Sequence, residues 1–183
     1  VVIRSAPEGN RVVIHAVLPR RTSFVRNTAG SRTEEQTVGA NIDTVFLLTS
    51  LNQDFNVRRI ERYLIIAWES GANPIVILSK SDLSDRVTEA ITEVQAVARG
   101  VAIHAISVVT GRGLREIAQY LKRGQTVALL GSSGVGKSTL INHLAGVDLL
   151  EVQIVRAHDD RGKHTTTHRE LVLLPSGGLV LDT

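Results

Sequence analysis

From residue 41 onward, short runs of apolar residues alternate with stretches in which apolar residues recur every three or four positions. The short runs, which have the length and composition of buried strands, lie at 44–49, 75–78, 102–106 and 126–130. The periodic stretches, which predict helices, lie at 57–68, 87–97, 114–121 and 138–144. Two further apolar runs, 171–174 and 179–181, predict a closing pair of strands. Strands separated by helices are typical of an α/β fold with a mainly parallel sheet covered on both faces.

The first 40 residues have a different pattern. Two β-rich runs, 1–4 and 11–18, flank the turn sequence Pro-Glu-Gly-Asn at 7–10 and predict a hairpin. We expect this hairpin to be the end of a small β-barrel, and the polar segment 21–39 to be a linker. The sequence therefore predicts two parts: 1–38, with barrel strands and linker, and 39–183, the α/β domain.

The composition is that of an ordinary globular protein. The chain has 183 residues, 43% of them hydrophobic and 21% charged, which is enough to bury a core without disulfide or metal cross-links. No uncharged apolar run approaches the ~18 residues that a membrane-spanning helix requires. A membrane protein is therefore excluded, and no membrane partner is expected.

The chain contains no cysteine and no methionine. Without cysteine it can form neither a disulfide nor a thiolate zinc site, which fits a reducing compartment and predicts a cytoplasmic location. Since no initiating methionine is present, we expect the chain to be an internal segment of a longer protein.

Positive charge is concentrated near the start of the chain. The formal net charge is only +3, too small to imply a nucleic acid by itself. No acidic residue lies between Glu8 and Glu34, however, and aromatic residues make up only 3% of the chain. RNA contacts would therefore be directed to phosphates rather than to stacked bases. The candidates are Arg20, Arg21, Arg26 and Arg32; a second group, Arg58, Arg59 and Arg62, has a solvated helix face as its alternative.

One motif carries clear chemistry. Residues Gly131, Ser132, Ser133, Gly134, Val135, Gly136, Lys137 and Ser138 match the pattern G-x-x-x-x-G-K-[ST] at every fixed position. The motif lies between an apolar strand and a helix, where the glycines let backbone N–H groups surround phosphate oxygens. Lys137 is expected to neutralise the β- and γ-phosphates and Ser138 to offer a hydroxyl to Mg²⁺. Thr139, the next residue, completes the predicted nucleotide-binding loop.

A second segment indicates which base is bound. Ser79, Lys80 and Asp82 follow a predicted strand, so Asp82 is expected at the carboxyl edge of the sheet, where ligands bind. A carboxylate there accepts both N1–H and N2–H of guanine, a donor pair that adenine lacks. Ser107 and Val108, after the next strand, are expected to aim a backbone N–H at guanine O6. The alternative is that Asp82 or Ser81 caps a helix.

Two downstream positions are candidates for the Mg²⁺ site. The polar segment 162–168 contains three consecutive threonines, one of which is expected to complete the Mg²⁺ shell and sense the γ-phosphate. Asp182 ends a strand and is placed to hold Mg²⁺ through water, or is an ordinary turn residue. His164 and His168 are spaced as a metal pair, but consecutive β-branched residues disfavour the helix that such a pair needs.

The order of these segments is unusual for a GTPase. The base-reading segments precede the phosphate loop, and the threonine segment and Asp182 follow it, so the elements are circularly permuted. With this order and the threonine triplet, the chain resembles the small ribosomal subunit biogenesis GTPases, the RsgA or YjeQ family. Segments 41–46, 50–56 and 58–64 resemble the family's lead-in to the GTPase domain, and 18–22 resembles the exit of its OB-type barrel.

The resemblance implies a GTP- and GDP-binding, Mg²⁺-dependent GTPase that binds rRNA and acts in late maturation of the small ribosomal subunit, which stimulates hydrolysis. It implies His164 as the substitute for a water-orienting glutamine and Thr166 as the Mg²⁺ ligand. It also implies that the chain stops within switch II, that Zn²⁺ belongs to a module beyond residue 183, and that the protein is a monomer. The alternatives are a P-loop ATPase or small-molecule kinase, and a non-enzymatic RNA-binding module with a vestigial nucleotide site.

Overall fold

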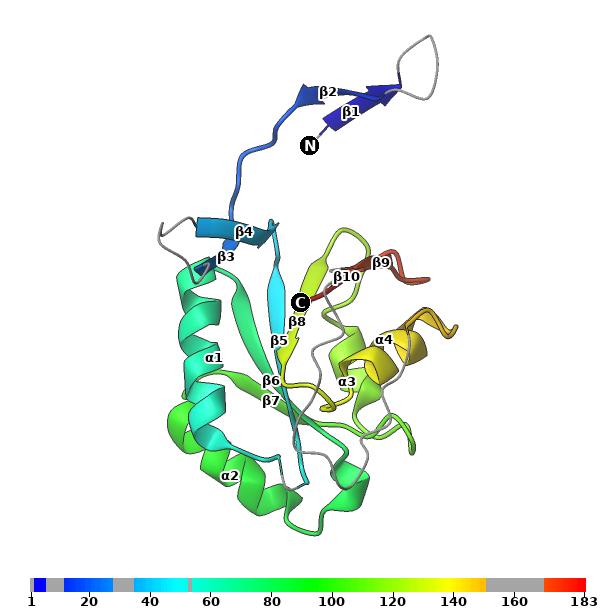
Figure 1. The fold of residues 1–183 in the computed structure, drawn as a ribbon. Coiled ribbons are helices and arrows are strands. Elements are labelled where there is room, and N and C mark those ends of the chain that lie inside the picture. Colours follow the sequence, from blue (N-terminus) through cyan, green and yellow to red (C-terminus); the bar gives the residue numbers. More distant parts are fainter. Residues whose placement is uncertain (1, 6–11, 28–34, 53, 151–169) are drawn as a thin grey trace.

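A six-stranded sheet forms the centre of the α/β body (Figure 1). The computed structural model describes residues 2–5, 12–27, 35–52, 54–150 and 170–183. The strands are ordered β7 (Ala102–Ala105), β6 (Asn73–Ser79), β5 (Thr44–Ser50), β8 (Thr126–Gly131), β10 (Leu179–Asp182) and β9 (Leu171–Leu173). All neighbours are parallel except β9 and β10. The predicted fold class is confirmed.

Helices cover both faces of this sheet (Figure 1). The helices are α1 (Val57–Ser70), α2 (Val87–Val97), α3 (Leu114–Ala118) and α4 (Lys137–Ala145). Side chains of β5 alternate between the layers: Val45 and Leu47 pack with α1 and α2, whereas Phe46 and Leu48 pack with α3 and α4. Burial on both faces explains why the central strands read as continuous apolar runs rather than as an alternating pattern.

Helix ends follow local capping chemistry. The Asn56 side chain accepts a hydrogen bond from Arg59 N and begins α1, and Gly71, at φ 79°, ends it in the left-handed conformation. Helix α3 is shorter than the predicted 114–121 segment. Beyond Ala118 the chain continues as tight turns in which Tyr120 N and Leu121 N each donate to the carbonyl three residues earlier.

The predicted N-terminal hairpin is present. Strands β1 (Val2–Ser5) and β2 (Val12–Ala16) pair antiparallel. In Figure 1 the pair stands apart from the α/β body, and Val13 and Ile14 on β2 are exposed.

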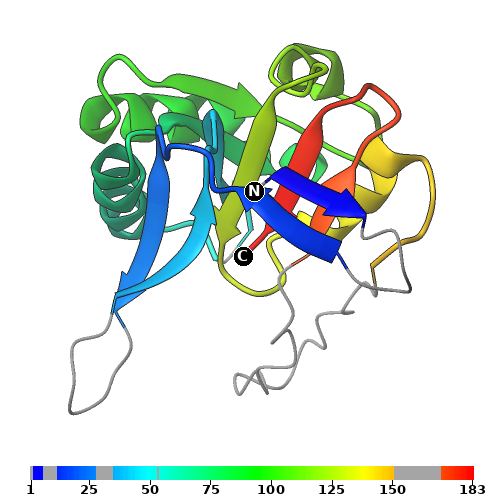
Figure 2. The ribbon, with the colours of Figure 1, turned by 90° about the horizontal axis from the view of Figure 1, so that it is seen from above.

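The segment predicted as a linker contains a second hairpin, so that prediction is wrong for most of its length. Strands β3 (Ser23–Asn27) and β4 (Glu35–Ala40) pair antiparallel and lie against α1, as Figure 2 shows from above. Phe24 is buried beside Ile42, and the Thr22 hydroxyl bonds to both N and O of Ile42. Among the hairpin side chains that the structure describes, the buried one is Phe24, which explains why the segment lacks a strand-like hydrophobic pattern.

Candidate nucleotide-binding site

The loop 131–136 joins the carboxyl end of β8 to the first turn of α4, which begins at Lys137. A Cβ on Gly131 would lie 2.7 Å from Leu48 O of the neighbouring strand, so only glycine lets the loop leave the sheet here. Gly134 and Gly136 have φ of 77° and 101°, in the left-handed region. The loop therefore has the glycine-dependent backbone conformation of a phosphate loop, and it lies at the edge of the sheet where ligands bind.

Lys137 lies over this loop. Its Nζ donates to Gly131 O at 2.8 Å and to Ser132 O at 3.2 Å. Burial lowers the pKa of Lys137, and the Asp182 carboxylate opposes that change. The ammonium group is therefore held at the loop and is poorly solvated, which favours binding of an anion. Ser138 and Thr139 follow it in the first turn of α4.

Asp182 ends β10, opposite Leu129 of β8. Its side chain is buried, and within the described part of the chain its Oδ1 has no hydrogen-bond partner. Burial raises the pKa of Asp182, while Lys137 lowers it to a smaller extent. A buried carboxylate oxygen without a partner is suited to a cation or its bound water, and with the Ser138 hydroxyl it supplies the oxygen ligands that Mg²⁺ prefers. The residues present fit the predicted Mg²⁺ site.

The predicted base-reading segment lies against the phosphate loop. The buried Ser79 hydroxyl, at the end of β6, donates to Val135 O at 2.6 Å and to Thr49 O at 3.3 Å. Lys80, with φ 55°, donates through Nζ to Gly134 O at 2.8 Å. Two residues that are far from the loop in sequence thus bind two of its carbonyls directly.

Asp82 is exposed and lies in a short 3₁₀ helix, η1 (Ser81–Leu83), just beyond this contact. The alternative role, capping of a helix by Ser81 or Asp82, is not observed. The capping positions of η1 and α2 are Lys80 and Arg86, and neither makes a side-chain capping bond. The Asp82 carboxylate is therefore not used in helix capping and lies exposed at this edge of the sheet.

The loop after β7 joins the same edge. Ser81 N donates to Ile106 O, which ties this loop to the base-reading segment. Ser107 is fully buried; its N–H donates to Arg112 O at 2.9 Å, and its hydroxyl accepts from Thr110 N. The Ser107 N–H already donates within its own loop. The predicted hydrogen bond to guanine O6 would therefore come from the backbone N–H of the half-buried Val108.

Two residues that contact the phosphate loop were not predicted. Asp54 and Arg59 form an ion pair at 2.8 Å, and both bind the Ser132 hydroxyl. Arg59 was a candidate for RNA phosphates, but its guanidinium is engaged here instead. Asp54 follows β5, the strand adjacent to β8 in the folded sheet, and this adjacency cannot be read from the sequence.

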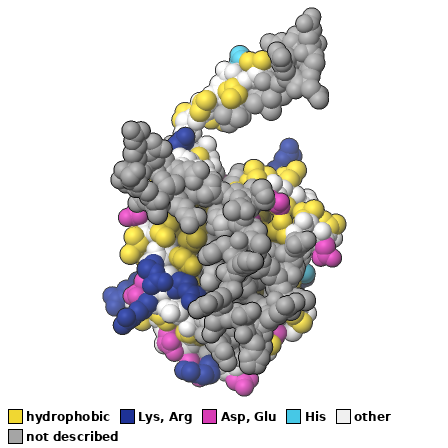
Figure 3. All heavy atoms as spheres, viewed as in Figure 1, with side chains coloured by type: hydrophobic (Ala, Val, Ile, Leu, Met, Phe, Trp, Pro, Cys, Tyr) yellow, Lys and Arg dark blue, Asp and Glu magenta, His cyan; other side chains and the backbone are white. Residues whose placement is uncertain are grey.

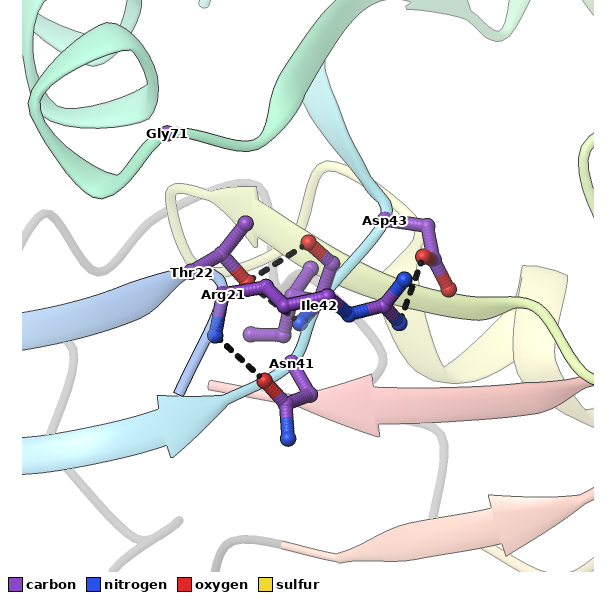
Figure 4. Close-up of a pocket in the computed structure, with 6 residues that line it drawn as sticks. All are labelled: Arg21, Thr22, Asn41, Ile42, Asp43 and Gly71. Atoms are coloured by element: carbon purple, nitrogen blue, oxygen red, sulfur yellow. Dashed lines mark hydrogen bonds and ion pairs between the residues drawn. The ribbon is translucent and has the colours of Figure 1, made fainter. Parts of the chain in front are cut away.

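Two of the predicted RNA-binding arginines, Arg20 and Arg21, lie away from the phosphate loop. Arg20 donates to Thr37 Oγ1, and the exposed Arg21 pairs with Asp43 at 3.5 Å. Arg21 and Asp43 line a pocket of about 200 Å³, shown in Figure 4. Since Asp43 precedes β5, the pocket is at the opposite edge of the sheet from the phosphate loop. The Arg26 side chain is not described, and Arg32, His164 and Thr166 lie outside the described residues.

Within the described residues, no three His, Asp or Glu side chains are grouped so as to hold a metal ion. No helix in the described part of the chain is long and apolar enough to cross a membrane.

Comparison with known proteins shows which family these features belong to. The sequence model of the RsgA GTPase family matches residues 17–183. The chain belongs to the RsgA GTPase family. Proteins named small ribosomal subunit biogenesis GTPase RsgA from Lactiplantibacillus plantarum (RsgA 2) and Opitutus terrae are 48% and 51% identical over 182 and 170 residues. These matches cover 100% and 93% of this chain but 51% and 46% of the relatives, so the chain spans about half their length.

Solved structures support the same fold. YjeQ from Thermotoga maritima superimposes with a TM-score of 0.67 at 26% identity, over 93% of this chain and 54% of that one. YloQ, described as a circularly permuted GTPase, superimposes with a TM-score of 0.54 at 21% identity, over 92% and 58% of the two chains, and shows the fold alone. The permuted order is confirmed.

Proposed function

We propose that this protein binds and hydrolyses GTP as an assembly factor for the small ribosomal subunit. The observation that carries this proposal is the pair of bonds from Ser79 and Lys80 to the phosphate-loop carbonyls. These bonds bring a base-reading segment and a phosphate loop into one site at one edge of the sheet. The printed names of the relatives support the same activity and the same partner.

The roles of the residues follow from charge and position. Asp82 accepts the N1–H and N2–H donors of guanine, the Lys80 stem packs along the base, and Val108 N–H meets the O6 carbonyl. The loop N–H groups and Lys137 bind the phosphates, and the loop and α4 residues Ser132, Ser133 and Thr139 complete the contact surface. An ATPase or small-molecule kinase would leave Asp82 without a role.

Mg²⁺ would be held by the Ser138 and Thr166 hydroxyls, with Asp182 acting through water. When bound, the ion neutralises charge that develops on the β- and γ-phosphate oxygens. Lys137 contributes the same kind of stabilisation from the protein. His164 is the candidate for orienting the attacking water, and we expect slow hydrolysis that the small ribosomal subunit stimulates.

Binding to the small ribosomal subunit would use the acid-free basic segment near the start of the chain. Arg20 and Arg21 are exposed, and Arg26 and Arg32 belong to the same segment. Figure 3 shows a second gathering of Lys and Arg side chains on the α1 and α2 side of the molecule, with acidic side chains among them, which fits a solvated face better. The protein would act in the cytoplasm as a monomer.

The test is GTP hydrolysis by the full-length protein, with and without purified small ribosomal subunits, at two salt concentrations. We expect strong stimulation that weakens as salt rises, and displacement of labelled GTP by GDP but not by ADP. The double variant Arg20→Gln/Arg21→Gln should reduce the salt dependence, whereas Arg86→Gln, at an exposed arginine just before α2, should not. Displacement by ADP would favour the ATPase alternative, and GTP binding without hydrolysis would favour the non-enzymatic module.

A further inference from the structure

Asp54, Arg59 and Ser132 form a closed hydrogen-bonded triangle at the beginning of the phosphate loop. Arg59 Nη1 lies 2.8 Å from both Asp54 carboxylate oxygens and donates to Ser132 Oγ at 2.8 Å. The Ser132 hydroxyl in turn donates to Asp54 Oδ2 at 2.7 Å. Each corner of the triangle thus holds the other two, and the Ser132 hydroxyl has one orientation.

The triangle is built on rigid supports. The Asn52 side chain accepts bonds from Ser50 Oγ and Asp54 N, which fixes the loop that carries Asp54. The Asn56 cap fixes the first turn of α1, from which Arg59 projects. The Arg59 and Asp54 side chains are 21% and 34% exposed, so their pair is partly shielded from water.

The opposite half of the phosphate loop is held from another direction. Ser79 and Lys80, at the end of β6, bind the carbonyls of Val135 and Gly134. Loops that follow two neighbouring strands, β5 and β6, therefore hold the two halves of the phosphate loop. Because the Asp54 carboxylate neutralises the Arg59 guanidinium, their contact with Ser132 fixes the position of the loop without adding net charge to the phosphate site.

We infer that Asp54 and Arg59 are positioning residues that hold the first half of the phosphate loop through the Ser132 hydroxyl. A loop fixed before binding loses less conformational entropy when it surrounds the phosphates. The contact joins groups of the protein only, so we expect it to act on the ground state and the transition state alike. Its loss should raise KM and the Kd for GDP while leaving kcat nearly unchanged.

The inference rests on the proposed guanine-nucleotide binding, so unmodified full-length protein is measured first with fluorescent GDP. Arg59→Gln and Ser132→Ala should weaken GDP binding about tenfold, since each removes a charge-assisted bond. Arg59→Lys, which keeps the charge near Asp54, should recover most of that loss. The double variant Arg59→Gln/Ser132→Ala should be no weaker than the worse single variant, because the two changes break the same unit. Arg86→Gln removes an exposed ion pair with Glu93 and serves as the matched control.

Steady-state GTP hydrolysis and melting temperatures of the nucleotide-free proteins complete the test. Additive effects in the double variant, or affinity losses that simply follow losses in melting temperature, would overturn the positioning role. A fall in kcat at unchanged KM would also overturn it, because Arg59 would then act on the transferring phosphate. If the unmodified protein fails to bind GDP, the proposed function fails first and this inference with it.

Discussion

Ser79→Ala tests whether the base-reading segment and the phosphate loop are one mechanical unit. The Ser79 side chain is 5% exposed, and its hydroxyl makes a 2.6 Å bond to Val135 O and a longer bond to Thr49 O. Removing it loses one good hydrogen bond and leaves the Val135 carbonyl without this donor. Such a change costs about 1–2 kcal/mol of the free energy of unfolding. The less constrained loop should also bind GDP about fivefold more weakly, which corresponds to about 1 kcal/mol.

The assay is urea unfolding followed by circular dichroism, together with a GDP titration. The midpoint should fall at constant m-value, since the surface exposed on unfolding does not change. Ser79→Thr is the matched variant, because it keeps the hydroxyl and a β-branched residue suits a strand. We expect Thr to recover most of the stability and affinity. If Ser79→Ala unfolds at the same urea concentration as the unmodified protein, the hydroxyl bond contributes nothing and the reasoning is refuted.

Two other predictions concern carboxylates at the same edge. Asp82→Asn places an amide donor against the guanine donors, so the affinity for GDP should fall at least about tenfold. The affinity for xanthosine diphosphate, which has an acceptor at that position, should rise. An equal loss of affinity for both nucleotides would contradict the base-reading role. Burial raises the pKa of Asp182 in the folded state above its ordinary value of 3.8. Between the unfolded-state and folded-state pKa values, the folded state binds more protons than the unfolded state. The free energy of unfolding therefore falls as pH rises through that window. Asp182→Asn should remove this dependence in urea unfolding at a series of pH values, and should weaken Mg²⁺-dependent GTP binding; an unchanged pH profile would exclude Asp182 as its source.

The α/β architecture could be predicted because its signals are local. Continuous apolar runs such as that of β5 arise from burial on both faces, and the periodic stretch of α1 lies between an asparagine cap and a glycine stop. The phosphate loop could also be predicted from the sequence, because its glycines are required by the local backbone. A Cβ at Gly131 would clash with the neighbouring strand, and Gly134 has a positive φ. These features depend on neighbours in sequence, and the sequence contains them.

Contacts between distant segments were decided only by the tertiary structure. The prediction of a linker missed the β3–β4 hairpin because Phe24 is the buried residue among the hairpin side chains that the structure describes, and one residue makes no periodic pattern. Arg59 was assigned to RNA because sequence shows charge but not its partner, Asp54, or the loop residue Ser132 some 73 positions away.

The same distinction applies within the candidate site. The sequence by itself determined which residue types can bind phosphates and guanine, since that follows from donors, acceptors and charge. It did not determine that Ser79 and Lys80 hold carbonyls of the phosphate loop. Those bonds depend on the parallel pairing of β5, β6 and β8, which aligns the carboxyl ends of strands that are far apart in the chain. Only the folded sheet brings these groups within hydrogen-bond distance.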